Sequence, residues 1–169
     1  MENLDTYSML AEIFGAVTIV IGAIFAFVQF YEYKKRLRIE MAAEMCRKFA
    51  EPELGRAVTL VKRLRDDISL QSLQAMDIEY EESAQIVGMA FETMGLLVYK
   101  KVASFELIQE LTGGLLLMMW RKTRSWIRET RELESNDRFG EWIEWLAMQV
   151  EAREQGMVPA YKAYSKWRG

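Results

Sequence analysis

The strongest constraint on this chain is a long run without a charged side chain near its start. Between Glu12 and Glu32, the residues IFGAVTIVIGAIFAFVQFY from Ile13 to Tyr31 carry no formal charge. As an α-helix this run is about 28 Å long, close to the roughly 30 Å hydrocarbon thickness of a bilayer. Core helices of soluble proteins seldom extend this far without a charge. The run therefore predicts a transmembrane helix over residues 13–31.

Charges on either side of the run predict its orientation. The side chains before it are acidic where charged, whereas Lys34, Lys35, Arg36 and Arg38 follow it within two turns. Positive charge stays on the cytoplasmic side of a membrane, and a secretory signal peptide has its basic region before the apolar run. We therefore expect residues 1–12 to form an extracytoplasmic tail. The rest of the chain is expected in the cytoplasm, at the inner (plasma) membrane and in contact with its lipid bilayer.

One face of the predicted membrane helix carries small and weakly polar residues. Their spacing of three or four positions places them on one side of an α-helix: Gly15, Thr18, Gly22, Ala26 and Gln29. Such a stripe lets two backbones approach closely, and the Gln29 amide can hydrogen-bond across the contact. The stripe predicts a seam for a homo-oligomer or for a partner helix. The alternative is that glycine and alanine are simply common in membrane helices.

The composition disfavours most enzyme chemistry. The chain has no histidine, which removes the usual general base near neutral pH, and Cys46 is its single cysteine. We therefore predict no catalytic residue, no metal site and no cofactor. All 22 Lys and Arg, and most of the 25 acidic residues, follow Tyr31. Because this part is close to neutral, nucleic-acid binding is not expected.

The part after the membrane helix is predicted to be all-α. No Pro or Gly interrupts the chain between Gly22 and Pro52, so the helix is expected to continue as a stalk over residues 32–51. A cytoplasmic domain of about four helices follows over residues 52–155, and an aromatic tail over 156–169. Periodicity and capping residues predict helices at Pro52–Asp66, Asp77–Lys101 and Phe105–Leu133, and from Asn136 or Asp137 to Arg153. Ser104 is the expected N-cap of the helix Phe105–Leu133.

Each predicted helix has an apolar stripe that we expect to face the core. The stripes are Leu54, Ala57, Val58, Val61 and Leu64; Ile86, Ala90, Thr93, Met94 and Leu97; Ile108, Leu111, Leu115, Met118 and Met119; and Phe139, Trp142, Ile143 and Leu146. The segment between Asp67 and Met76 lacks clear periodicity and is expected to be a loop with one helical turn.

The second half of the chain resembles a bacterial family. The resemblance is carried by FETMGLLVYKKVASFELI from Phe91, by Trp120, Ile127 and Arg131, and by FGEWIEWLA from Phe139 to Ala147. The pattern is similar to a widespread group of proteins of unknown function, in which a membrane helix precedes a small cytoplasmic helical domain. The group's form is F-E-x-x-G-x-L-V, a basic turn, a long helix with Trp and Arg, and a final aromatic helix. The likeness covers roughly residues 50–150 and implies no activity. This chain departs at Lys101, where a glycine is commoner, and after Gly156.

Four residues of this pattern are predicted to have structural roles. Phe91 is expected to fill the core, and Gly95 to let another helix pack closely. Glu92 is expected to pair with Arg131 or Arg128 across a helix interface, because a buried ion pair often orients two elements.

Two further groups are candidate contact surfaces. Arg121, Lys122, Arg124 and Arg128, with Trp120 and Trp126, form a candidate face for an anion or a partner. The alternative is a solvated helix face balanced by Glu129, Glu132 and Glu134. In the tail, Tyr161, Tyr164 and Trp167 are candidates for a protein contact, unless they fold back onto their own domain.

The leading functional hypothesis is a membrane-tethered helical adaptor. It would self-associate or serve as an accessory subunit of a larger membrane protein complex. The alternative is a sensor or effector that binds an anionic ligand or lipid headgroup through the basic face. A carboxylate-based enzyme is a third hypothesis, and it requires several buried acids around a cavity.

Overall fold

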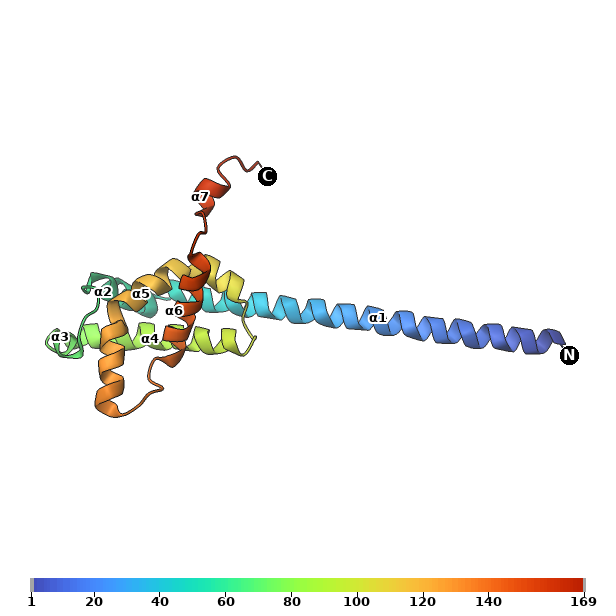
Figure 1. Ribbon diagram of the computed structural model, residues 1–169, viewed down its shortest axis with the longest axis horizontal. Helices are drawn as coiled ribbons and strands as arrows, with labels where there is room; N and C mark the ends of the chain where they lie inside the picture. The colour runs from blue at the N-terminus through green and yellow to red at the C-terminus, as the bar shows by residue number, and fades with distance from the viewer. Residues whose placement is uncertain (1, 169) are drawn as a thin grey trace. The chain divides into compact units, whose positions relative to one another are not determined.

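The structure is a computed structural model that describes residues 2–168. These residues are 80% helical and include no strand, which confirms the predicted all-α class. A long apolar helix at the N-terminal side is followed by a bundle of several helices (Figure 1). The chain divides into two compact units, Met1–Arg38 and Ile39–Gly169.

The helix α1 spans Glu2–Arg47 and contributes to both units. In the first unit, an 18-residue stretch has a mean hydropathy of 2.3, and none of it is buried. In the second unit, Ala42 and Met45 of the same helix are buried. The residues from Ile39 onward, which the sequence predicts as stalk, are therefore part of the packed domain.

A short break separates α1 from α2. The 3₁₀ helix η1, Lys48–Ala50, ends at Glu51 in an extended conformation, and Pro52 opens α2, Pro52–Arg63. Proline suits this first position because it has no amide hydrogen to satisfy. All five residues of the predicted α2 stripe are buried. The helix is three residues shorter than predicted, because the chain turns towards α5, Phe105–Glu134. There the N–H groups of Asp67 and Ile68 donate to the carbonyl oxygens of Arg121 and Lys122.

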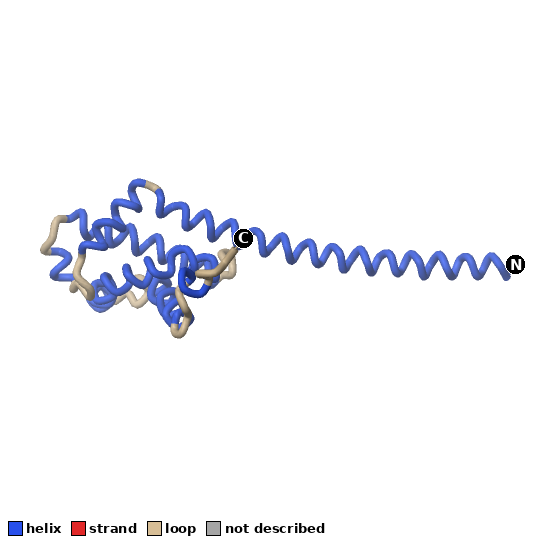
Figure 2. Tube along the Cα trace, turned by 90° about the horizontal axis from the view of Figure 1, so that it is seen from above, coloured by secondary structure: helices blue, strands red, loops and turns tan. Residues whose placement is uncertain are grey.

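The next three helices follow the predicted order. They are the short α3, Leu70–Gln74, then α4, Ile78–Tyr99, and α5, Phe105–Glu134. The Ser104 side chain accepts a hydrogen bond from the Leu107 N–H, which confirms the predicted cap. In the bundle α4 packs against α2 and against α6, Glu141–Glu154, and α5 packs against α6, α2 and α3. Figure 2 shows the loops that join these helices.

The helix α6 spans Glu141–Glu154 and begins later than predicted. The Asn136 side chain caps only a turn, in which it accepts a hydrogen bond from the Arg138 N–H. The chain then passes through Gly140 at φ +67° before the helix starts. A residue in the left-handed region cannot continue a right-handed helix. The last helix, α7, is the short Ala160–Ala163.

The predicted stripes of α4 and α5 are partly wrong. Thr93 is exposed, and its hydroxyl donates to the Met89 carbonyl oxygen within the same helix. Leu111 is 57% exposed. On α5 the neighbouring Thr112 and Gly113 are buried instead, because small side chains allow α6 to approach closely.

Candidate functional site

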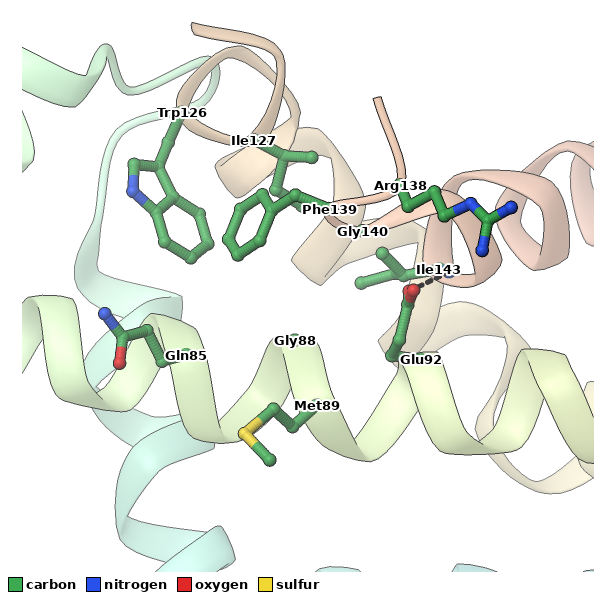
Figure 3. A pocket seen from close by; sticks show the side chains of 10 residues that line it. All are labelled: Gln85, Gly88, Met89, Glu92, Trp126, Ile127, Arg138, Phe139, Gly140 and Ile143. Carbon is green, nitrogen blue, oxygen red and sulfur yellow. Dashed lines mark hydrogen bonds between the residues drawn. The ribbon is translucent and has the colours of Figure 1, made fainter. Parts of the chain in front are cut away.

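The second unit contains a cavity of about 410 Å³ between α4, α5 and the start of α6. Figure 3 shows its lining, which is Gln85, Gly88, Met89 and Glu92 of α4, Trp126 and Ile127 of α5, Arg138, Phe139 and Gly140 of the following loop, and Ile143 of α6. Trp126, Ile127 and Ile143 are buried, whereas Met89 is 71% exposed. The walls are therefore mostly apolar, with Met89 at an open edge.

Two glycines shape this cavity. Nothing lies within 4 Å of the point where a Cβ of Gly88 would stand, so the α4 wall is open there. Gly140 has φ +67°, a conformation that glycine adopts without a steric cost, and a Cβ there would lie 2.7 Å from Cγ2 of Ile127. Beside it, Phe139 packs edge to face on Trp126, with ring centroids 5.5 Å apart. The loop is thereby held against α5.

Glu92 caps α6 instead of forming the predicted ion pair. Its Oε2 atom accepts hydrogen bonds from the backbone N–H groups of Trp142 at 3.0 Å and Ile143 at 2.8 Å. The carboxylate lies at one end of the cavity, below Ile143 (Figure 3). The first N–H groups of a helix have no partner within it, and a carboxylate both satisfies them and complements the helix dipole. The predicted pairing with Arg131 or Arg128 is wrong.

Arg131 and Arg128 both bind Glu144 of α6. Nη1 of Arg131 lies 2.5 Å from one carboxylate oxygen, and Nη2 of Arg128 lies 2.7 Å from the other. Arg131 Nε also donates to the Phe139 carbonyl oxygen at 2.6 Å. Burial raises the pKa of Glu144, but the hydrogen bonds and charges of the two arginines outweigh it, so this pKa lies below its ordinary value. The cluster joins α5, the loop and α6.

Replacing Glu144 with glutamine is expected to lower the free energy of unfolding by about 1–3 kcal/mol at neutral pH, because Arg131 loses its anionic partner. A carboxyl with a lowered folded pKa stabilises the fold above its unfolded pKa of about 4.3, and this contribution is lost as the pH falls through the folded value. The free energies of unfolding of the variant and the parent should therefore become equal in acid. Chemical unfolding in detergent, followed by tryptophan fluorescence, checks this; an equal difference in acid would contradict it.

Gly95 lies at a direct contact between α4 and α6. A Cβ on Gly95 would stand 2.3 Å from the backbone oxygen of Trp142, so a larger residue does not fit without a shift of the helices. Phe91, one turn earlier, is fully buried and packs on Phe49 with ring centroids 5.1 Å apart. The structure thus places Gly95 at a helix crossing and Phe91 in the core.

Three cations of the basic face of α5 form ion pairs with two carboxylates that follow α2. Arg121 and Lys122 lie 3.3 Å and 2.9 Å from Asp66, and Arg124 lies 2.5 Å from Asp67. The hydrogen bond from Lys122 lowers the pKa of Asp66, and the one from Arg124 lowers the pKa of Asp67. These cations are already paired within the chain.

The two tryptophans grouped with this face lie in the core. Trp120 is 7% exposed and Trp126 is 2% exposed, so neither belongs to a surface site. Arg128 lies 5.5 Å from the centroid of the Trp120 ring. Glu129, one of the expected counter-charges, instead accepts a hydrogen bond from the Leu70 N–H at 2.7 Å.

The small-residue stripe of α1 is exposed in the first unit. Nothing lies within 4 Å of a Cβ placed on Gly15 or Gly22. The Thr18 hydroxyl donates to the carbonyl oxygen four residues earlier, while Ala26 and Gln29 are also exposed. This face is free of contacts from the rest of the described chain.

The basic flank and the aromatic tail are exposed as well. The flank consists of Lys34, Lys35, Arg36 and Arg38. In the tail, Tyr161, Tyr164 and Trp167 are 74%, 69% and 76% exposed. The tail rings therefore do not fold back onto their own domain.

The cavity has mostly apolar walls and two charged side chains, Glu92 and Arg138. Its one carboxylate, Glu92, accepts hydrogen bonds from two backbone N–H groups, and the guanidinium of Arg138 lies on the same side of the cavity as Glu92, away from the rings of Trp126 and Phe139 (Figure 3). Within residues 2–168, no group of three or more His, Cys, Asp or Glu is placed to hold a metal ion. Sequence analysis missed this cavity because its walls come from separate segments; the Gly88 and Gly140 positions were its only local signals.

Comparison with known protein families gives a match over most of the chain. Residues 16–150 match the model of a family described as a domain of unknown function, DUF4760. No curated protein and no solved structure matches the chain.

Proposed function

The chain belongs to the DUF4760 family, and from this premise we propose that it is a membrane-anchored helical adaptor that self-associates or serves as an accessory subunit of a larger membrane protein complex. The observation that carries the proposal is the apolar part of α1, none of which is buried. The second unit of the chain would be held at the inner membrane surface, where this unit would meet other proteins.

The apolar side chains of α1 support the anchoring. Large residues such as Phe14, Ile19 and Phe27 are 79%, 73% and 72% exposed. A continuous apolar surface of this extent is unfavourable in water, whereas the hydrocarbon of a bilayer covers a helix of this length. Lys34 to Arg38 then favour an orientation with the second unit in the cytoplasm.

Two observations favour an anchor over a cleaved signal sequence. The family model begins at residue 16, inside the apolar run, so most of that run is part of the family's domain. The basic residues also follow the run and do not precede it.

The intact mass of the membrane-bound protein is the direct test of the anchor. The full 19.7 kDa chain is expected, and a shorter chain would contradict the anchor.

The paired cations of α5 favour the adaptor over a sensor for anions. Asp66 pairs with Arg121 and Lys122, and Asp67 pairs with Arg124, within the chain. An anionic ligand would have to displace these carboxylates. We therefore propose contacts with proteins as the main activity of this chain, and no enzymatic role.

Self-association through α1 is expected to be visible by oxidative cross-linking. In a Cys46→Ser background, Gly22→Cys should yield disulfide-linked dimers, because Gly22 lies on the small-residue stripe where two backbones can meet. The matched control is Ile24→Cys, which lies about 200° around the same helix at the same depth. Non-reducing gels at native expression give the readout. Equal cross-linking at both positions, or monomers only, would remove self-association and leave the accessory-subunit version.

A further inference from the structure

We propose that the described part of the tail, residues 156–168, binds the anionic lipid headgroups of the inner leaflet and forms a second membrane contact in addition to α1. This inference rests on the proposed anchoring of α1 in the membrane. It assigns a partner to the part of the chain that lies beyond the family match.

The tail combines exposed apolar side chains with unopposed positive charge. Five large residues are 58–76% exposed: Met157, Val158, Tyr161, Tyr164 and Trp167. Lys162, Lys166 and Arg168 lie among them, and residues 156–168 contain no Asp or Glu. Tyrosine and tryptophan rings prefer the depth of the headgroups, and Lys and Arg carry positive charge to the lipid phosphates. The cations of the α5 face differ, because each has a carboxylate partner.

The turn from α4 into α5 lies at the end of the second unit that holds its part of α1, and α5 runs in the same direction as that part of α1 (Figure 1).

The tail leaves the domain beside these first turns of α5. Arg153, near the end of α6, pairs with Glu106 at 3.6 Å. Gln109 donates to the Met157 sulfur at 3.6 Å. The tail thus starts within two turns of Phe105.

The turn between α4 and α5 adds to the same end of the domain. Lys100 and Lys101 are exposed there, next to Tyr99 at 52% and Val102 at 40% exposure. This turn immediately precedes the cap of α5. It extends the positive and aromatic surface that we assign to lipid, whereas a surface for a basic or neutral protein partner would not require such an excess of cations.

The experiment uses the full chain in lipid nanodiscs and an environment-sensitive fluorophore on a single cysteine. In a Cys46→Ser background, Ser165→Cys carries the label in the tail, Ile24→Cys carries it in α1, and Leu133→Cys carries it on the exposed C-terminal end of α5. Nanodiscs contain phosphatidylcholine alone, or equal parts of phosphatidylcholine and phosphatidylglycerol. We expect the Ser165 label to be about threefold brighter in anionic nanodiscs and to be quenched by spin-labelled lipid.

Charge variants of the tail provide the matched control. Lys162→Glu, Lys166→Glu and Arg168→Glu together should abolish the anionic-lipid signal, whereas Lys162→Arg, Lys166→Arg and Arg168→Lys should keep it. An aqueous Ser165 label with the Ile24 label in lipid would overturn this inference and leave the anchor intact. An aqueous Ile24 label would overturn the anchor too. Shielding of Ser165 that depends on the number of chains per nanodisc, and not on lipid charge, would identify a protein contact and overturn the lipid assignment.

Discussion

Replacing Gly95 with alanine is expected to destabilise the second unit by about 3 kcal/mol, the upper part of the range for overpacked cores. The added Cβ would lie 2.3 Å from the backbone oxygen of Trp142 and 2.8 Å from its carbonyl carbon. Both contacts are with backbone, so no side-chain rotation relieves them, and α4 and α6 must move apart. Chemical unfolding of the full chain in detergent measures the effect. Tryptophan fluorescence reports it, because all five tryptophans lie in the second unit.

The matched control is Gly88→Ala, the same substitution on the same helix. A Cβ at Gly88 meets nothing within 4 Å. Alanine has the higher helix propensity, so this variant should be more stable than the parent by about 0.5–1 kcal/mol. The two substitutions are thus expected to have opposite signs. A Gly95→Ala variant as stable as Gly88→Ala would show that α4 and α6 do not approach as described.

Placing two arginines in the apolar part of α1 is expected to release the protein from the membrane. Val20 and Ile24 are 57% and 61% exposed and lie near the middle of the predicted span. A central arginine costs about 3 kcal/mol on insertion scales, so Val20→Arg with Ile24→Arg should lower membrane partitioning by roughly a thousandfold or more. Pelleting of membranes after alkaline extraction measures the fraction that remains.

The control for added charge is an arginine at an equally exposed apolar position of the second unit. Leu133 is 72% exposed, near the end of α5, and Leu133→Arg should leave the protein in the membrane fraction. Unchanged membrane retention of the double arginine variant would mean that α1 is not the anchor. In that case the exposed apolar surface of α1 would have to be covered by another protein.

Local signals in the sequence were sufficient for the helices themselves. The uncharged run predicts an apolar helix, Pro52 predicts the start of α2, and Ser104 predicts the start of α5, because each acts through its own neighbours in the chain. The α2 stripe was also predicted correctly, since it presents a single apolar face to the core.

Periodicity was less reliable for helices with several neighbours. The helix α5 turns Thr112 and Gly113 towards α6, where a Cβ of Gly113 would lie 3.2 Å from the Val150 side chain. Close packing selects small residues at such a crossing, whereas an apolar stripe points to the larger Leu111. The buried face of α5 therefore differs from its most apolar face.

The sequence by itself determined the all-α class, the exposed apolar helix and most helix boundaries, because these depend on residues within a few positions of one another. Only the tertiary structure decided that Glu92 caps α6, that Asp66 and Asp67 pair with cations of the basic face, and that a cavity lies beside Gly88. Each of these contacts joins segments far apart in the chain. Which carboxylate meets which donor is set by how the helices pack, and several acidic residues in the sequence are chemically equivalent candidates until that packing is known.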